Sequence, residues 1–297
     1  MAKAIIVLAG SKQANKLGNT IKKATKDMTE KSITLSFAHD EYDYITVIKD
    51  APKTPQEARD LGGNMVKKYK STVDEIVFDV TRLNDVKEGA ALAAYEFNKY
   101  KTKPKENKLQ VQPAGISTSV NFARDLVTEP GNALYPEKYA DRINETLTPL
   151  GVKVRVIYQR ELERIGMDML LSVGQGSENN SAVVIMEHLH GPEGEQPIAL
   201  VGKGVTFDTG GISLKPGRNM GDMKYDMGGS AAVVGAMHAI ADKKLKKNVI
   251  GIVGLVENMP DGKAIKPGDV VRSLSGQYVE NLNTDAEGRL VLGDILT

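Results

Sequence analysis

The chain has 297 residues, of which 41% are hydrophobic and 26% charged, so it is long enough for two folded domains and does not have the composition of a disordered protein. Its 39 Lys and Arg residues against 38 Asp and Glu give a net charge of +1, which excludes a global electrostatic attraction to nucleic acid or to anionic membranes. It has no cysteine, which excludes disulfides, thiolate metal sites and cysteine nucleophiles.

The first residues contain an apolar run that is too short to span a bilayer and that lacks a cleavage-like site, so we expect a cytoplasmic protein.

Thr54-Pro55-Gln56-Glu57 is a capping box that predicts a helix running towards Lys70. A second helix is expected over residues 85–100, followed by a lysine-rich exposed connector at 101–108. β-Branched runs predict strands at residues 4–9, 33–37, 44–48 and 75–80. Residues 1–115 are therefore expected to form a small α/β domain.

A larger α/β domain is expected over residues 116–297, beginning with helices at 120–127 and from Tyr135 onwards. Strands are predicted at residues 153–158, 182–187, 198–202 and 248–256, and their alternation with helices indicates a mixed sheet covered by helices on both faces. The helix expected at 229–241 is rich in Gly, Ala and Ser, which would let it lie close to the sheet. Residues 289–297 begin an apolar, helix-like run that stops without a cap, so we expect the domain to be incomplete at its C-terminal end.

Three glycine-rich segments, 202–211, 224–229 and 283–289, carry charged residues where strands are expected to end, and open α/β sheets bind ligands at that edge. The residue order of a phosphate-binding loop is absent, so a nucleotide site is not expected. The segments carry four carboxylates, which cannot all remain ionised in a confined pocket unless cations compensate them. Two divalent ions would balance the charge of Asp208, Asp226, Asp285 and Glu287.

The last of these segments has alternating charges. In an extended stretch Asp285, Glu287 and Arg289 would face the same side, although a surface ion pair between Glu287 and Arg289 is the simpler interpretation of the triplet alone. Oxygen ligands of this kind suit Mn²⁺ or Mg²⁺, and Zn²⁺ also accepts them.

Of the histidines, His188 and His190 could chelate a metal from one face of a strand, but we expect them to be solvent-exposed at a loop edge. We expect His238 to be a packed or partly exposed helix residue.

The octapeptide Asn283-Thr284-Asp285-Ala286-Glu287-Gly288-Arg289-Leu290 closely resembles the signature of the leucyl aminopeptidase (cytosol aminopeptidase) family. The resemblance to the family also covers residues 201–216, 223–229, 257–260 and 266–269. Residues 123–130 resemble the family more weakly. Residues 1 to about 110 resemble the family's variable, macro-like N-terminal domain only in layout and in Glu88-Gly89-Ala90.

By position, the resemblance implies that Lys203, Asp208, Asp226 and Glu287 hold the tighter of two metal ions, Mn²⁺ or Zn²⁺. Asp208, Asp285 and Glu287 would hold the more exchangeable ion. Lys215 resembles a protonated lysine that stabilises the oxyanion, and Arg289 resembles the residue that anchors a bicarbonate ion. The implied reaction is hydrolysis of the first peptide bond of a peptide with a free N-terminus, with leucine or another apolar residue preferred.

The resemblance also implies a homohexamer and a family scaffold that continues beyond Thr297. An alternative is that the chain is an inactive fragment of such an enzyme. A DNA-binding role would use residues 99–108, but a solvated linker fits their composition better because aromatic residues are not interleaved with the lysines. A different two-metal hydrolase, such as a phosphatase, is disfavoured by the lysine ligand and by the octapeptide.

Overall fold

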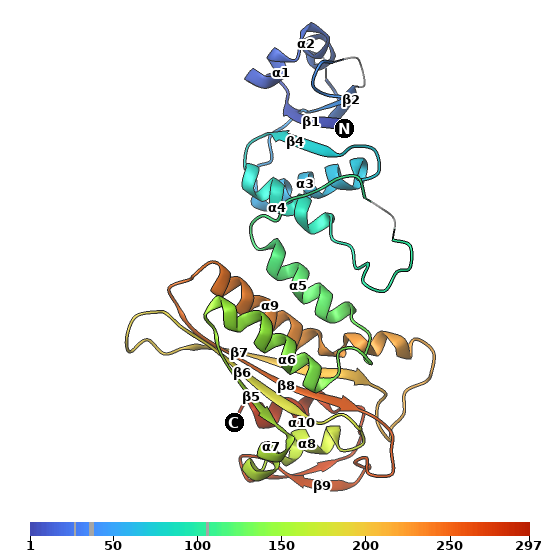
Figure 1. The fold of residues 1–297 in the computed structure, drawn as a ribbon, viewed down its shortest axis with the longest axis vertical. Coiled ribbons are helices and arrows are strands. Elements are labelled where there is room, and N and C mark those ends of the chain that lie inside the picture. The colour runs from blue at the N-terminus through green and yellow to red at the C-terminus, as the bar shows by residue number, and fades with distance from the viewer. Residues whose placement is uncertain (27, 36–38, 105–106) are drawn as a thin grey trace. The chain divides into compact units, whose positions relative to one another are not determined.

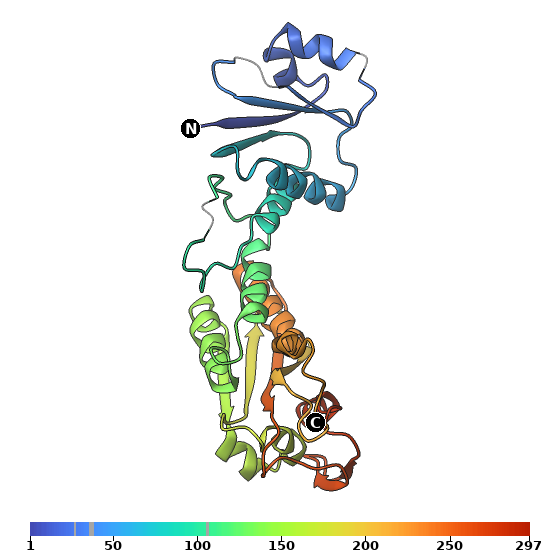
Figure 2. The same ribbon diagram turned by 90° about the vertical axis from the view of Figure 1, so that its right-hand side faces the viewer.

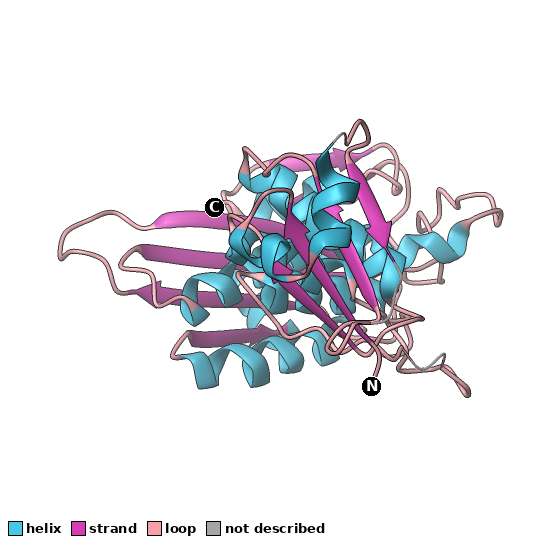
Figure 3. Ribbon diagram, turned by 90° about the horizontal axis from the view of Figure 1, so that it is seen from above, coloured by secondary structure: helices cyan, strands magenta, loops and turns pink. Residues whose placement is uncertain are grey.

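The computed structural model describes residues 1–26, 28–35, 39–104 and 107–297. Contacts divide the chain into two compact units, Met1–Asn121 and Phe122–Thr297. The units divide after Asn121, within helix α5 (Ser117–Thr128). The boundary predicted from the sequence, between residues 115 and 116, falls just before this helix. Helices and strands are mixed along the chain (Figure 3), which confirms the expected α/β class. No helix in the described ranges is both long enough and apolar enough to cross a membrane.

The N-terminal unit (Figure 1) is built around a four-stranded sheet. The order of its strands is β2-β3-β1-β4. Strand β1 runs parallel to β3 and β4, and β2 pairs antiparallel with β3. The four expected strands are present, although residues 36–38, at the end of the second, lie outside the described residues. The strands are β1 (Lys3–Leu8), β2 (Ser32–Leu35), β3 (Tyr44–Ile48) and β4 (Glu75–Asp79).

The longer helices of this unit follow its last two strands, and one of them is shorter than predicted. The capping box works as expected, because the Glu57 amide donates to Thr54 Oγ1 at 3.1 Å. The helix expected over residues 85–100 ends at Ala93. Beyond it, Glu96 pairs with Lys70 at 3.6 Å, a tertiary contact that ties this stretch to the end of the preceding helix. The helices are α1 (Lys12–Lys16), α2 (Asn19–Lys26), α3 (Pro55–Tyr69) and α4 (Leu83–Ala93).

The C-terminal unit contains a four-stranded mixed sheet in the order β5-β6-β8-β7 (Figure 1). Strands β5 and β8 both pair antiparallel with β6, whereas β7 and β8 are parallel. A separate hairpin of β9 (Asp269–Arg272) and β10 (Tyr278–Asn281) follows. The strands of the main sheet are β5 (Lys153–Tyr158), β6 (Ala182–Leu189), β7 (Ile198–Asp208) and β8 (Asn248–Asn258).

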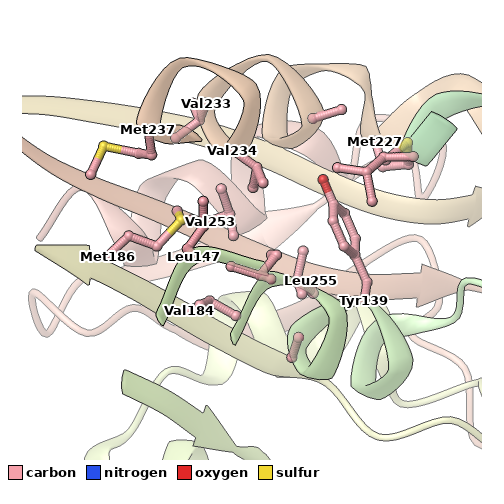
Figure 4. Close-up of a cluster of buried hydrophobic side chains, with 14 of the residues drawn as sticks. Tyr139, Leu147, Val184, Met186, Met227, Val233, Val234, Met237, Val253 and Leu255 are labelled. Atoms are coloured by element: carbon pink, nitrogen blue, oxygen red, sulfur yellow. The ribbon is translucent and has the colours of Figure 1, made fainter. Parts of the chain in front are cut away.

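Helices cover both faces of this sheet, as predicted (Figures 1 and 2). On one face, α6 (Pro136–Leu147) and α9 (Gly228–Asp242) enclose a core with β6 and β8, which includes Tyr139, Met186 and Val234 (Figure 4). On the other face, the core lies between the sheet and α7 (Gln159–Ile165), α8 (Asp168–Gly174) and α10 (Gly288–Ile295). Two 3₁₀ segments, η1 (Thr148–Leu150) and η2 (Met220–Met227), complete the unit.

Strand β7 is longer than predicted, since it continues past Gly202 to Asp208. Its residues 198–205 pair with 249–256 of β8, and a register shift then brings Asp208 opposite Asn258. The small-residue helix α9 lies as close to this strand as expected, because a Cβ on Gly202 would come within 2.7 Å of Ser230 Cα. Parallel pairing brings the carboxyl ends of β7 and β8 to one edge of the sheet, where open α/β sheets bind ligands.

The histidine predictions hold for two of the three residues considered. His188 was expected to be exposed, but it is only 2% exposed, and its Nε2 lies 2.9 Å from the Leu245 carbonyl oxygen. The expectation is wrong because β6 continues to Leu189, so that His188 keeps the inward alternation of the strand. His190 is exposed, as predicted. His238 is packed within α9, 5.6 Å from the Phe122 ring between centroids.

Candidate metal centre

Strand β7 provides two of the predicted site residues, Lys203 within the strand and Asp208 at its end. The Lys203 ammonium lies 2.7 Å from Asp226 Oδ1 and 2.8 Å from Glu287 Oε1. Gly288 makes room for this side chain, because a Cβ there would lie 2.9 Å from Lys203 Cδ. Gly229 makes room for the Lys203 main chain, because a Cβ there would lie 3.3 Å from the Lys203 carbonyl oxygen. Lys203 is therefore the centre of one half of the cluster.

Lys215 is the centre of the other half. Its ammonium lies 2.5 Å from Asp208 Oδ2 and also contacts Asp285 Oδ1. The loop that carries Lys215 folds back on β7, since the Lys215 amide donates to the Thr209 carbonyl oxygen at 2.9 Å. This turn requires glycine at two positions, because Gly210 and Gly211 adopt φ values of 89° and 65°.

Asp285 and Glu287 do not lie in an extended stretch, contrary to the prediction. The chain turns at this point, with the Ala286 amide donating to the Asn283 carbonyl oxygen at 3.0 Å, and helix α10 begins at Gly288. The turn sends Glu287 inwards, to 3% exposure, while the Asp285 side chain remains 34% exposed. Arg289 falls in the first turn of α10 and is exposed.

Asp226 comes from a 3₁₀ segment rather than from the end of a strand. Segment η2 leads directly into α9 and packs against β7, which places Asp226 beside Lys203. The ion pairs form two groups, one around Lys203 and one around Lys215, and the two groups meet where the oxygens of Asp208, Asp285 and Glu287 approach one another. Together they form one cluster of six side chains at the carboxyl edge of the sheet: Lys203, Asp208, Lys215, Asp226, Asp285 and Glu287.

The cluster carries more negative than positive charge, because four carboxylates face two ammonium groups. Burial lowers the pKa of Lys203, but its hydrogen bonds to Asp226 and Glu287 raise that pKa by more, and the result lies above the usual value. Burial raises the pKa of the Asp226 carboxyl; the Lys203 ammonium opposes that rise, while the neighbouring Asp208 and Glu287 add to it. Both groups therefore hold protons more tightly than usual, Asp226 mainly because it is buried and Lys203 because of its carboxylate partners.

Divalent cations fit this cluster. Asp208, Asp285 and Glu287 each offer a carboxylate oxygen, and these oxygens all lie within 4.8 Å of one another. In the part of the chain that the structure describes, Asp226 Oδ2 and Glu287 Oε2 are buried without a hydrogen-bond partner. An unpaired buried carboxylate oxygen is costly, and a metal ion would satisfy it.

Two buried polar residues to which the sequence assigned no role also belong to the site. Asn258, at the end of β8, donates from Nδ2 to Asp208 Oδ1 at 2.8 Å. Thr284 Oγ1 donates to the Gly210 carbonyl oxygen at 2.6 Å and accepts from the Ser213 amide at 2.8 Å. The signals that could have identified them are the position of Asn258 just after the strand predicted at 248–256 and the position of Thr284 within the glycine-rich segment 283–289.

The catalytic domain of the cytosol aminopeptidase family matches residues 121–297, which is more than half of the chain. The chain belongs to the cytosol aminopeptidase family. This membership confirms the resemblance that rested on the octapeptide at residues 283–290, and every residue of the cluster lies within the matched range.

Several members of the cytosol aminopeptidase family are similar to this chain over much of its length. A probable cytosol aminopeptidase of Rickettsia felis is 54% identical over 228 residues, covering 70% of this chain and 46% of that protein. One of Xanthobacter autotrophicus is 47% identical over 280 residues, covering 85% and 56%. Among solved structures, the bottromycin maturation enzyme BotP in complex with Mn aligns with a TM-score of 0.82 at 30% identity, covering 99% of this chain and 68% of that one. The chain spans about half the length of the curated relatives it matches.

Proposed function

We propose that the chain carries the metal centre of a two-metal aminopeptidase, which removes the N-terminal residue from peptides. The observation that carries the proposal is the cluster of four carboxylates and two lysines, in which two buried carboxylate oxygens have no partner among the described residues. Family membership supports the reaction class.

Two overlapping sets of residues would hold the ions. We assign Lys203, Asp208, Asp226 and Glu287 to the tighter ion, and Asp208, Asp285 and Glu287 to the more exchangeable one. Mn²⁺ or Zn²⁺ fits these ligands, and the similar protein BotP was solved in complex with Mn. When bound, the ions lower the pKa of a water molecule to about 7 and polarise the scissile carbonyl group.

The remaining side chains act on protons and on charge. Lys203 must give up its proton to serve as a ligand, and the field of two nearby dications favours that loss. Lys215, whose ammonium now pairs with Asp208 and Asp285, would donate to the substrate carbonyl oxygen, which would lower the barrier by roughly 3–4 kcal/mol. Arg289 would bind bicarbonate as a proton carrier, because Glu287 is occupied by Lys203 and by metal and cannot act as the base.

The proposed substrates are peptides with a free N-terminus, with leucine or another apolar residue first. Exposed apolar side chains near the cluster favour that preference, since Ile212 and Leu214 on the Lys215 loop are 44% and 58% exposed. The proposal includes a homohexameric whole enzyme in the cytoplasm that needs neither membrane nor nucleic acid.

The proposal is tested by the release of product from a leucine anilide by this chain. We expect activity that is lost with a chelator, returns with Mn²⁺ and is absent in Asp285→Asn, a variant of nearly equal volume that reduces the ligand charge. Activity that survives both chelation and Asp285→Asn would contradict the metal mechanism. No activity with either Mn²⁺ or Zn²⁺ would identify the chain as an inactive fragment of such an enzyme.

A further inference from the structure

Asn258 is a buried polar residue at the junction of the two segments that carry most of the carboxylates. It is the last residue of β8, it is 1% exposed, and the strand register sets it opposite Asp208 of β7. On its other side runs the 283–287 turn, which carries Asp285 and Glu287. A neutral amide in this position can donate hydrogen bonds without adding charge to the site.

The side-chain amide of Asn258 connects these two segments directly. Its Nδ2 donates to Asp208 Oδ1 at 2.8 Å and to the Thr284 carbonyl oxygen at 3.0 Å. Both partners are acceptors, so the amide orientation is fixed by its bonding. The main-chain carbonyl of Asn258 accepts from the Thr209 amide at 3.0 Å and from Thr209 Oγ1 at 2.8 Å. The residue therefore fixes the start of the Lys215 loop as well.

The loop is shaped to fit this amide. A Cβ on Gly211 would lie 2.7 Å from Asn258 Oδ1, and Gly211 has a φ of 65°, so a larger residue is excluded by both space and backbone conformation. Thr284, whose carbonyl accepts from Asn258, is also joined to the loop through the Gly210 carbonyl oxygen. The two segments are thus joined by a continuous set of buried hydrogen bonds.

The consequence for Asp208 is that its two oxygens are not equivalent. Oδ1 accepts from Asn258 Nδ2 and, at 2.9 Å, from the Gly210 amide. Oδ2 faces the Lys215 ammonium. Oδ1 is held by two neutral donors of the protein, whereas the partner of Oδ2 is a cation, the Lys215 ammonium, so Oδ2 is the oxygen that faces a positive charge.

We propose that Asn258 is a positioning residue of the metal centre. By holding Asp208 and the 283–287 turn in one arrangement, it sets the affinity of the site for divalent cations. The inference rests on the proposed function, because it concerns the ions assigned there. Hydrogen-bond partners that orient metal ligands change metal affinity about 10- to 100-fold when they are removed.

The test compares Asn258→Ala with Asn248→Ala, two substitutions in the same strand. Asn248 stands at the opposite end of β8, and its side chain bonds to the backbone of residues 191–195, including the Gly191 amide at 2.9 Å. Mn²⁺ binding is measured by electron paramagnetic resonance of the free ion, and the unfolding midpoint is measured with a chelator present. Both variants should lower the midpoint, but only Asn258→Ala should weaken Mn²⁺ binding, by about 10- to 100-fold.

Equal Mn²⁺ affinity in Asn258→Ala and in the wild-type chain would overturn the inference. Failure of the wild-type chain to bind Mn²⁺ would instead refute the proposed function. If Asn258→Ala does not fold, the wild-type chain is titrated with Zn²⁺, and the side-chain amide resonances of its asparagines are followed by nuclear magnetic resonance. The Asn258 resonance should shift with Zn²⁺ while that of Asn248 stays in place, and an unmoved Asn258 resonance would reject the inference.

Discussion

Lys203 lies among carboxylates that would otherwise be uncompensated in the chain without metal. Its ammonium is within 2.8 Å of both Asp226 and Glu287, and the Glu287 side chain is only 4% exposed. Removing one partner of a buried ion pair leaves the other charge without compensation, which costs more than the pair itself contributes.

Replacing Lys203 with methionine should therefore lower the free energy of unfolding by about 3 kcal/mol when a chelator is present. The matched control is Lys266→Met, which removes an ammonium from a pair with Asp269 whose lysine side chain is 67% exposed, and it should cost less than about 1 kcal/mol. Urea unfolding of both variants measures the difference. Losses of equal size would show that Lys203 does not compensate the buried carboxylates.

At this scale the sequence predicted which charged side chains lie together, but not all of the hydrogen bonds that hold them. The acidic residues and lysines are bordered by glycine, a pattern visible in the sequence alone. The Asn258–Asp208 hydrogen bond joins residues 50 apart, and it depends on strand register, which tertiary structure determines. The burial of His188 was missed for a related reason, since the strand continues two residues beyond its predicted end.

At the scale of the elements, helix α9 lies close to strand β7, which carries Lys203 and Asp208 of the site. Gly202 faces the backbone of Gly229 and Ser230, and a Cβ there would lie 2.7 Å from Ser230 Cα. Gly202→Ala should lower the free energy of unfolding by about 1–3 kcal/mol, because neither backbone can give way without strain.

The control for this substitution is Gly217→Ala, where a Cβ would meet nothing within 4 Å. It should leave the urea midpoint close to that of the wild-type chain. A tolerated Gly202→Ala would mean that the helix can move away from the strand.

Helix α9 also carries a histidine that makes stability depend on pH. Burial lowers the pKa of His238 below its usual 6.5, with Lys243 adding to the effect and Asp242 opposing it. The unfolded chain then takes up a proton that the folded chain resists, so stability is present above about pH 6.5 and is lost as the pH falls through the lowered pKa.

His238→Phe keeps an aromatic ring beside Phe122 and cannot titrate. The loss of unfolding free energy between about pH 7.5 and about pH 5 should be smaller in this variant than in the wild-type chain. Denaturant unfolding at the two pH values measures it, and an unchanged loss would assign the pH dependence to other groups.

The elements themselves were largely predictable, because strand runs and helix caps are local signals. The turn at 283–287 was not. Its charges alternate as in a strand, but Glu287 and Lys203 attract each other from distant segments, and helix α10 begins immediately afterwards. The predicted strand β7 was likewise too short, because its glycines are typical of loops. In the structure, a Cβ on Gly202 would meet α9 at Ser230 Cα, and a Cβ on Gly204 would meet Leu255 and Gly254 of β8.

At the scale of the whole molecule, the cluster lies entirely within the unit formed by Phe122–Thr297. The sequence indicated this division through the lysine-rich connector and the change in family resemblance along the chain. The mixed sheet covered on both faces was also predicted, since alternating strands and helices have few other arrangements. The order of the four strands was not, because it depends on contacts between segments far apart in the chain.

The most direct measurement of the central claim is equilibrium dialysis of the purified chain against Mn²⁺, followed by metal analysis. The two overlapping ligand sets predict two ions per chain, of which Asp285→Asn loses the more exchangeable one and keeps the tighter one. A wild-type chain that retains no Mn²⁺, or an Asp285→Asn chain that retains as much as the wild type, would contradict the assignment of this cluster as a two-metal centre.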